Sequence, residues 1–92
     1  MVPVHPGRIL KREMAARHLS ANQLALALRV PSGRITSILN GKRAISADTA
    51  LRLSHYFGNS AQFWLNLQTR YDLAVVEQEH GARIAAEVEA AA

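Results

Sequence analysis

Cysteine is absent from the sequence, which excludes disulfide bonds and sites that bind a metal through thiolates. No stretch approaches the roughly 18 consecutive apolar residues that a helix needs to cross a membrane. Residues 1–7 contain no charged region followed by an apolar run, so a secretory signal peptide is not indicated. Together these absences predict an intracellular protein of the cytoplasm.

Residue sets that support catalysis are also missing. There is no Ser/His/Asp set and no pair of carboxylates, and Gly41-Lys42 lacks the rest of a phosphate-cradling glycine loop. The four histidines are scattered. Glu77 and His80 have the i, i+3 spacing of carboxylate-bridged metal sites, but such a site needs further glutamates from other helices. We therefore expect no enzymatic activity, no cofactor and no metal.

Charge is divided unevenly along the chain. Residues 1–43 hold eight Lys and Arg and a single acid, Glu13, whereas residues 44–92 hold three basic and six acidic residues. The two halves therefore carry net charges of +7 and −3, which give the overall +4. A basic half joined to an acidic half indicates one surface for a polyanion such as nucleic acid and another surface for a second partner. An unevenly charged surface that only contacts water is the alternative.

Proline, glycine and short polar residues divide the chain into short helices. Pro6 suits a first helical turn, where a missing N–H costs nothing. Four serines are placed as N-caps: Ser20, Ser32, Ser46 and Ser60. Three glycines are placed at or near helix ends: Gly41, Gly58 and Gly81. The predicted helices run from about 7 to 18, from Ser20 to Val30, from about 33 to 39, from Ser46 to Gly58 and from about 61 to 79. No strand-like alternation occurs, so we expect an all-α, compact five-helix bundle.

The C-terminal residues 82–92 are rich in Ala and Glu and have a high helix propensity. Ile84 and Val88 would share one face of such a helix. The segment is either an extra docked helix or a frayed end, because a short isolated helix is marginal in water. We therefore divide the chain into a main helical domain at 1–80 and a helical tail at 81–92.

Residues 20–43 have the pattern of a helix-turn-helix, two short helices separated by a turn of three or four residues. On a helical wheel, the second helix gathers three aliphatic residues on one side: Ile35, Ile38 and Leu39. Small or hydrogen-bonding residues lie opposite, with Arg34 at the flank: Gly33, Thr36, Ser37 and Asn40. Such a helix can lie deep in a major groove, where short hydroxyls and arginine reach base edges. An amphipathic hairpin whose outer face only meets water is the alternative.

The domain at 1–80 is thus predicted to be a helix-turn-helix DNA-binding domain, and its contacts with double-stranded DNA are expected to be of two kinds. Five residues are predicted to read bases: Ser32, Gly33, Arg34, Thr36 and Ser37. Four flanking residues are predicted to bind phosphates: Ser20, Asn22, Lys42 and Arg43. Gly33 presents no side chain where the reading face begins, so the sequence does not define which bases are read.

Aromatic and aliphatic residues in the second half are predicted to form the core between two helices. On the fifth helix these are Phe63, Trp64, Leu67 and Tyr71, and on the fourth they are Ala50, Leu53 and Phe57. Trp64 or Tyr71 at a subunit interface is the alternative. The acidic residues after Tyr71 are either a solvated helix face or a docking surface for a basic partner.

Several segments of the chain are similar to the HigA/VapI family of antitoxins, within the Xre/Cro-like repressor class. The similarity covers roughly residues 5–75 and is carried by these segments: His5-Pro6-Gly7, Val30-Pro31-Ser32-Gly33-Arg34-Ile35, Asn40-Gly41-Lys42-Arg43, Ser46-Ala47-Asp48-Thr49-Ala50-Leu51-Arg52-Leu53, Phe63-Trp64-Leu65-Asn66-Leu67-Gln68 and Tyr71-Asp72-Leu73. The helix-turn-helix alone would indicate only a Cro-like repressor, whereas the opening His-Pro-Gly and the last two segments are more specific.

The resemblance implies a lambda-repressor-like five-helix fold and a homodimer that binds a palindromic operator and represses its own operon. It also implies a HigB-type, RNA-cleaving toxin that the chain would neutralise. The base-reading roles would fall to Arg34, Thr36 and Ser37, and the phosphate contacts to Lys42 and Arg43.

Two positions depart from the family pattern, Arg29 and Gly33, the latter because it has no side chain where the reading face begins. Arg29 stands where the family usually has a glycine in left-handed conformation, so either the turn differs or Arg29 gains a contact, such as one with a phosphate. Two other functions stay open: a stand-alone Cro-like repressor without a toxin, and a helical protein-interaction module that has lost DNA binding.

Overall fold

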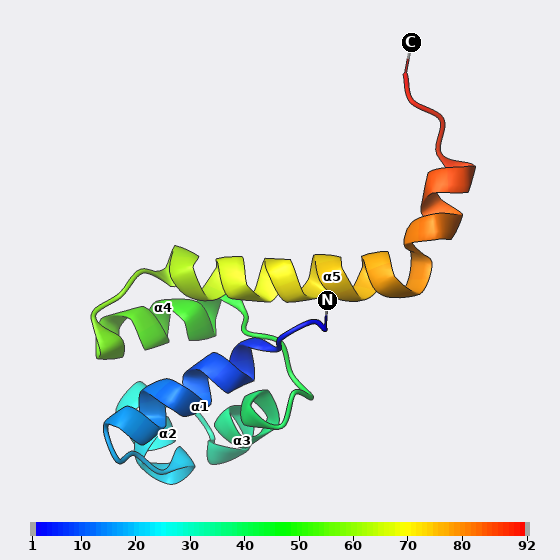
Figure 1. Cartoon of the computed structure of the whole chain (residues 1–92). Coiled ribbons are helices and arrows are strands. Elements are labelled where there is room, and N and C mark those ends of the chain that lie inside the picture. The colour runs from blue at the N-terminus through cyan, green and yellow to red at the C-terminus, as the bar shows by residue number, and fades with distance from the viewer. Residues whose placement is uncertain (1, 92) are drawn as a thin grey trace.

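Five α-helices follow one another between residues 2 and 91, the part of the chain that the computed structural model describes, and no strand occurs in that part. Their bounds are α1 Pro6–Ala16, α2 Ala21–Leu28, α3 Ser32–Leu39, α4 Ala47–Phe57 and α5 Ala61–Glu87. Helices α1 to α4 lie together on one side of the long α5, and α2 and α3 are joined by a short turn (Figure 1). The predicted all-α, five-helix class is confirmed.

Three of the four predicted serine caps are confirmed. The side-chain oxygens of Ser20, Ser46 and Ser60 each accept a hydrogen bond from the backbone N–H three residues later, at 3.1, 3.3 and 3.0 Å. At Ser20 the motif is a full capping box, because the Ser20 N–H also donates to Gln23 Oε1 at 2.8 Å. These bonds satisfy backbone groups that a helix start leaves without an intrahelical partner.

The third helix begins differently from the prediction, whereas Pro6 is confirmed in the first turn of α1. In α1 the cap is His5, whose Nδ1 accepts from the Gly7 N–H at 2.9 Å. In α3 the cap is Pro31, without a side-chain hydrogen bond, so the prediction that Ser32 caps this helix is wrong. The reason is that the Pro31 carbonyl already accepts from the Arg34 N–H, which puts Ser32 inside the first turn.

The helix ends predicted from glycines are confirmed at two of the three positions. Gly41 and Gly58 have left-handed backbones, with φ of 73° and 77°, as helix ends prefer. At Gly81 the predicted stop is wrong, since α5 continues to Glu87. A glycine costs about 1 kcal/mol within a helix, and the alanine-rich sequence around this one offsets that cost. Figure 1 shows that α5 bends sharply in its orange part, near residue 80 on the colour bar.

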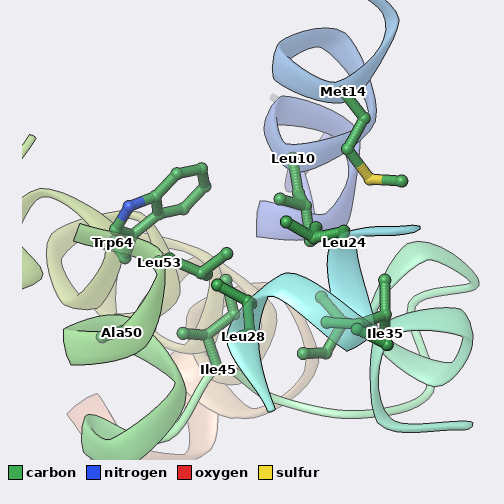
Figure 2. Packing of buried hydrophobic residues seen from close by; sticks show 11 residues of the cluster. Leu10, Met14, Leu24, Leu28, Ile35, Ile45, Ala50, Leu53 and Trp64 are labelled. Carbon is green, nitrogen blue, oxygen red and sulfur yellow. The ribbon is translucent and has the colours of Figure 1, made fainter. Parts of the chain in front are cut away.

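The hydrophobic core gathers residues from all five helices around the centre of the α1–α4 group (Figure 2). Its buried members are Leu10, Met14, Leu24, Ala25, Leu28, Ile35, Ile38, Ile45, Ala50, Leu53 and Trp64. Trp64 is fully buried, and its indole N–H donates to Asn59 Oδ1 at 2.9 Å. Phe63 leaves 40% of its surface exposed, so its assignment to the core is wrong, whereas Trp64, Ala50 and Leu53 are confirmed. Leu67, Tyr71 and Phe57 are half-buried.

Gln68 connects α5 to the segment between α3 and α4. Its buried side chain accepts from the Ile45 N–H at 2.8 Å through Oε1 and donates to Asp72 Oδ1 at 2.9 Å through Nε2. A buried backbone N–H without a partner would cost about 1–3 kcal/mol, so this amide fixes the loop that follows α3. Hydrophobic periodicity did not indicate this contact, because a polar residue on a helix is normally predicted to be exposed.

The part of α5 beyond the core makes the molecule elongated. The Cα radius of gyration is 15.8 Å, against about 12 Å expected for a globular chain of this length, and the longest extent is 51 Å. Ile84 on this part of α5 is exposed, and so is Val88, which follows the helix with an extended backbone. None of the helices described here combines the length and apolar content that a membrane span requires.

Gly7 lies where the start of α1 approaches the backbone of α3. A Cβ atom added at Gly7 would overlap the backbone carbonyl of Ile38, whereas one added at Gly33 would meet no atom within 4 Å. We expect Gly7→Ala to lower the free energy of unfolding by about 1–3 kcal/mol, because the backbones must separate. Gly33→Ala, the matched control, should raise it by up to about 1 kcal/mol. Urea denaturation followed by circular dichroism measures both; equal effects would contradict the close approach.

Acid should destabilise the fold through His5. Burial lowers the pKa of His5 below its usual 6.5. The charge of Asp72 and a hydrogen bond with the Arg43 backbone act in the opposite direction, but their effect is smaller. The unfolded chain therefore binds more protons just below pH 6.5, so stability is greatest above that pH and falls as the pH drops below it. Protonation of Nδ1 would also remove the acceptor that caps α1.

The measurement is the melting temperature between about pH 7 and pH 5. His5→Asn keeps a side-chain oxygen as a cap acceptor and does not titrate, so its melting temperature should fall less than that of the wild type. His55→Asn, at an exposed position on α4, is the control and should follow the wild type. The same decrease in all three proteins would show that His5 is not the responsible group.

Candidate nucleic-acid interface

The turn between α2 and α3 sets the relative orientation of the two helices. The Arg29 N–H donates to the Leu26 carbonyl at 3.2 Å and the Val30 N–H to the Ala25 carbonyl at 3.0 Å. These two bonds are those of a Schellman motif, which requires a left-handed residue. Arg29 supplies it, with φ 61° and ψ 44°. The turn is therefore the one that a glycine would make, and the arginine keeps it at a cost of about 1 kcal/mol.

Packing then decides which face of α3 points outward. Ile35 and Ile38 have no exposed surface, and they pack in the same core as Leu24 and Leu28 of α2 (Figure 2). Because these isoleucines point inward, the opposite side of the eight-residue helix faces solvent. The predicted aliphatic face is confirmed.

The predicted base-reading residues occupy that outer side to different degrees. Ser32, Gly33 and Thr36 are exposed, and Ser37 is half-buried. The Thr36 hydroxyl donates to the Ser32 carbonyl at 3.1 Å, so its oxygen stays available as an acceptor. The face therefore offers small groups that would not hold the helix away from a surface laid against it.

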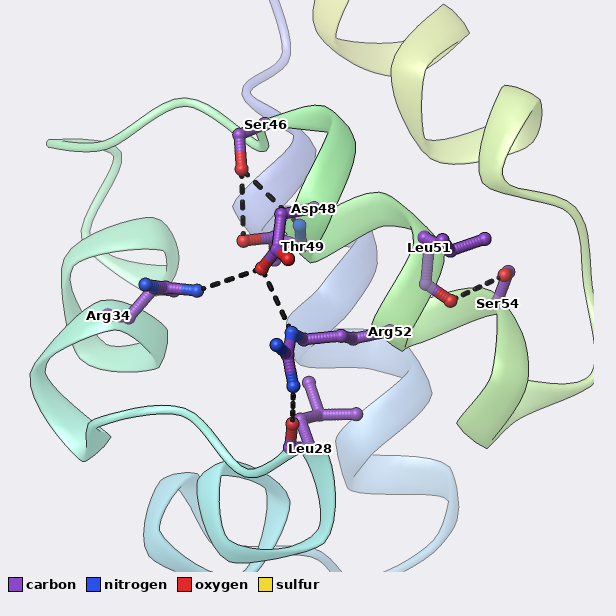
Figure 3. Close-up of polar contacts among 8 residues, drawn as sticks. All are labelled: Leu28, Arg34, Ser46, Asp48, Thr49, Leu51, Arg52 and Ser54. Atoms are coloured by element: carbon purple, nitrogen blue, oxygen red, sulfur yellow. Dashed lines mark hydrogen bonds and ion pairs between the residues drawn. The ribbon is translucent and has the colours of Figure 1, made fainter.

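Arg34 is placed differently from the other residues of this set. Its side chain is 29% exposed, and Nη1 lies 3.2 Å from Asp48 Oδ2, in the first turn of α4 (Figure 3). The same carboxylate oxygen accepts from Arg52 Nε at 2.9 Å, and Arg52 Nη1 donates to the Leu28 carbonyl at 2.9 Å. The hydrogen bond from Arg52, with the charges of both arginines, lowers the pKa of Asp48 below its usual value.

These contacts surround an open cleft beside α3, with a volume of about 550 Å³. The turn before α3, the loop after it and the start of α4 line the cleft. The charged residues of the lining are four arginines and one carboxylate: Arg29, Arg34, Arg43, Arg52 and Asp48. The net positive charge next to an exposed hydroxyl-bearing helix is the electrostatic arrangement that attracts a polyanion.

The predicted phosphate-binding residues flank the outer face of α3. Lys42 and Arg43 follow the helix and are exposed, and the Lys42 N–H donates to the Ser37 carbonyl at 2.9 Å, which holds this loop against α3. Asn22 lines a small hollow together with Ser32, so the start of α2 lies beside the start of α3. Ser20 is exposed, and its oxygen is engaged as the α2 cap, which leaves the hydroxyl hydrogen free to donate.

Sequence reasoning missed the roles of Asp48 and Arg52. The i, i+4 spacing of the two on α4 could have indicated their own pairing, which the sequence analysis did not predict, but no local pattern indicates the bond to Arg34, 14 residues earlier. Within residues 2–91 no group of three or more potential ligands is arranged to hold a metal ion.

Comparison with known proteins places these features in a family. The helix-turn-helix family profile matches residues 10–64. Virulence-associated protein I of Dichelobacter nodosus is 52% identical over 80 residues, which cover 86% of this chain and 74% of that protein.

Two solved structures have the same fold over nearly the whole chain. An addiction module antidote protein of the HigA family from Coxiella burnetii has a TM-score of 0.96 and 49% identity, covering 99% of this chain and 100% of the other. The antitoxin HigA of Pseudomonas aeruginosa, solved with the higBA promoter, has a TM-score of 0.92 and 44% identity, covering 95% of this chain and 96% of the other. With its Schellman turn, inward isoleucines and exposed α3 face, the chain belongs to the helix-turn-helix family and, within it, to the HigA/VapI family.

Proposed function

We propose that the chain is an antitoxin that binds operator DNA through α3 and represses transcription of its own operon. The observation that carries the proposal is the exposed hydroxyl-bearing face of α3, bordered by a cleft that holds four arginines. Support comes from the Pseudomonas HigA, a relative of nearly the same length that was solved with promoter DNA. The proposal places the chain in the cytoplasm and includes no catalytic step.

In this proposal α3 lies in the major groove. Ser32, Thr36 and Ser37 are short enough to let the helix approach the base edges, and Arg34 supplies the longer reach. Gly33 lies in the first turn of α3, next to Ser32, and its missing side chain allows the backbone to approach the DNA closely. Sequence preference depends on these residues of α3.

Phosphate contacts flank the reading helix and fix its register. Lys42 and Arg43 bind one side of the groove, and Ser20 and Asn22 bind the other. Each phosphate neutralised by a lysine or arginine releases counterions, so affinity should fall as salt rises.

A second copy and a toxin complete the proposed assembly. A homodimer would present two α3 helices to a palindromic operator, and the exposed Leu73, Val76 and Ile84 on α5 offer it apolar surface. A HigB-type toxin would be bound through the acidic end of α5, which carries Glu77 and Glu87. Helix α5 extends beyond the core, so this end is open to a partner.

Arg34→Ala and Lys42→Ala should affect DNA binding in different ways. Loss of a base contact at Arg34 should weaken operator binding by about 1–3 kcal/mol and reduce the preference over unrelated DNA. Loss of a phosphate contact at Lys42 should weaken binding to all sequences equally and lower the salt slope by about one. Fluorescence anisotropy with the upstream region of the gene and with unrelated DNA, at two salt concentrations, measures both.

A wild-type protein that shows no saturable, salt-weakened binding to its upstream region would contradict the proposal and favour a protein-interaction module. Identical behaviour of the two variants on all DNA would contradict the division between base and phosphate contacts.

Toxin neutralisation is tested separately from DNA binding. We expect a small open reading frame next to the gene. Expression of its product alone should arrest growth, and co-expression of the chain should relieve the arrest. A neighbouring product without toxicity would instead favour a stand-alone repressor.

A further inference from the structure

Asp48 is a negative charge in a place where a polyanion should bind. It is the one carboxylate among the residues that line the cleft beside α3, and its side chain is 58% exposed. A carboxylate that faces DNA phosphates is repelled by them, so it weakens affinity for DNA of any sequence. A residue with this cost needs a compensating role at the interface.

The contacts of Asp48 show what it holds. Oδ2 accepts from Arg34 Nη1 at 3.2 Å and from Arg52 Nε at 2.9 Å (Figure 3). Arg52 in turn donates to the Leu28 carbonyl, at the end of α2, at 2.9 Å. A chain of charge-assisted bonds therefore runs from α2 through α4 to Arg34, the one long cationic side chain that α3 carries.

A guanidinium held in this way can still bind a base. The bond to Asp48 uses one Nη1–H of Arg34, and the remaining N–H groups of the planar fork are free to donate. A side chain already fixed by a carboxylate loses less conformational freedom when it binds, and it is less free to turn to whichever phosphate is near.

We infer that Asp48 is a positioning residue that determines specificity. It fixes Arg34 for base contact and keeps that guanidinium from turning to any nearby phosphate, so it raises the ratio of operator affinity to affinity for unrelated DNA. Its own charge lowers affinity for all DNA alike and leaves that ratio unchanged. This inference rests on the proposed function, because it assigns a role within the same DNA interface.

A double-mutant cycle tests the role of Asp48 through the affinity ratio. Asp48→Asn removes the charge and keeps the shape. It should raise affinity for unrelated DNA several-fold at low salt and lower the ratio of operator to unrelated affinity by about tenfold, the size of one contact of about 1.4 kcal/mol. In the Arg34→Ala background, the same change should raise affinity for both DNAs equally and leave the ratio unchanged.

Two further variants separate positioning from general effects of charge or folding. Asp48→Glu keeps the carboxylate and should recover part of the ratio. Glu13→Gln makes the same charge change on α1, where Glu13 Oε2 pairs with Arg17 Nη1 at 2.6 Å, and should leave the ratio unchanged. Circular dichroism of each variant shows whether the helices are intact.

The inference is overturned if the wild type prefers its operator but Asp48→Asn changes the affinity for both DNAs by the same factor. It is also overturned if the loss of preference is as large in the Arg34→Ala background. A wild type with no preference at all would instead show that the proposed function is wrong, so the two failures are distinguishable.

Discussion

Burial of two isoleucines on a helix of eight residues determines the rest of the interface. A helix this short is not stable alone in water, because nucleation costs more than two turns recover. Ile35 and Ile38 lose all their exposed surface to the core, which contributes about 1.5–3 kcal/mol each. Since their side chains fix the rotation of α3 about its own axis, they also fix which residues face outward. The surface that we assign to DNA is thus a consequence of core packing.

The turn before α3 shows how strongly this packing constrains the backbone. Arg29 adopts a left-handed conformation that usually falls to glycine, and both bonds of the Schellman motif are nevertheless formed. The strain is small compared with the burial of the isoleucines that the turn makes possible. An arginine at this position also adds a positive charge to the cleft beside α3, where a glycine would add none. Local strain and local charge therefore occur at the same residue.

Sequence reasoning predicted the features that depend on near neighbours. The caps at Ser20, Ser46 and Ser60 and the end at Gly58 each involve residues within four positions, so the local sequence contains the signal. The aliphatic face of α3 was predictable for the same reason. The helix end predicted at Gly81 was wrong, because a glycine ends a helix only when the following residues leave it. Here the following residues are strong helix formers. The roles in reading bases and phosphates stay predictions.

Contacts between distant parts of the chain were not predictable. Gln68 meets Ile45, and Arg34 meets Asp48, through packing of α5 and α4 that no local pattern encodes.

The second of these contacts changes the physical description of the interface. From the sequence, Arg34 is a free cation at the flank of an otherwise neutral reading face. In the structure it shares a carboxylate with Arg52, so the positive charge next to α3 is both reduced and fixed in position. A fixed guanidinium favours one geometry of a partner, whereas a free one accepts any nearby phosphate. Discrimination at this surface therefore depends on a negative charge that weakens binding overall.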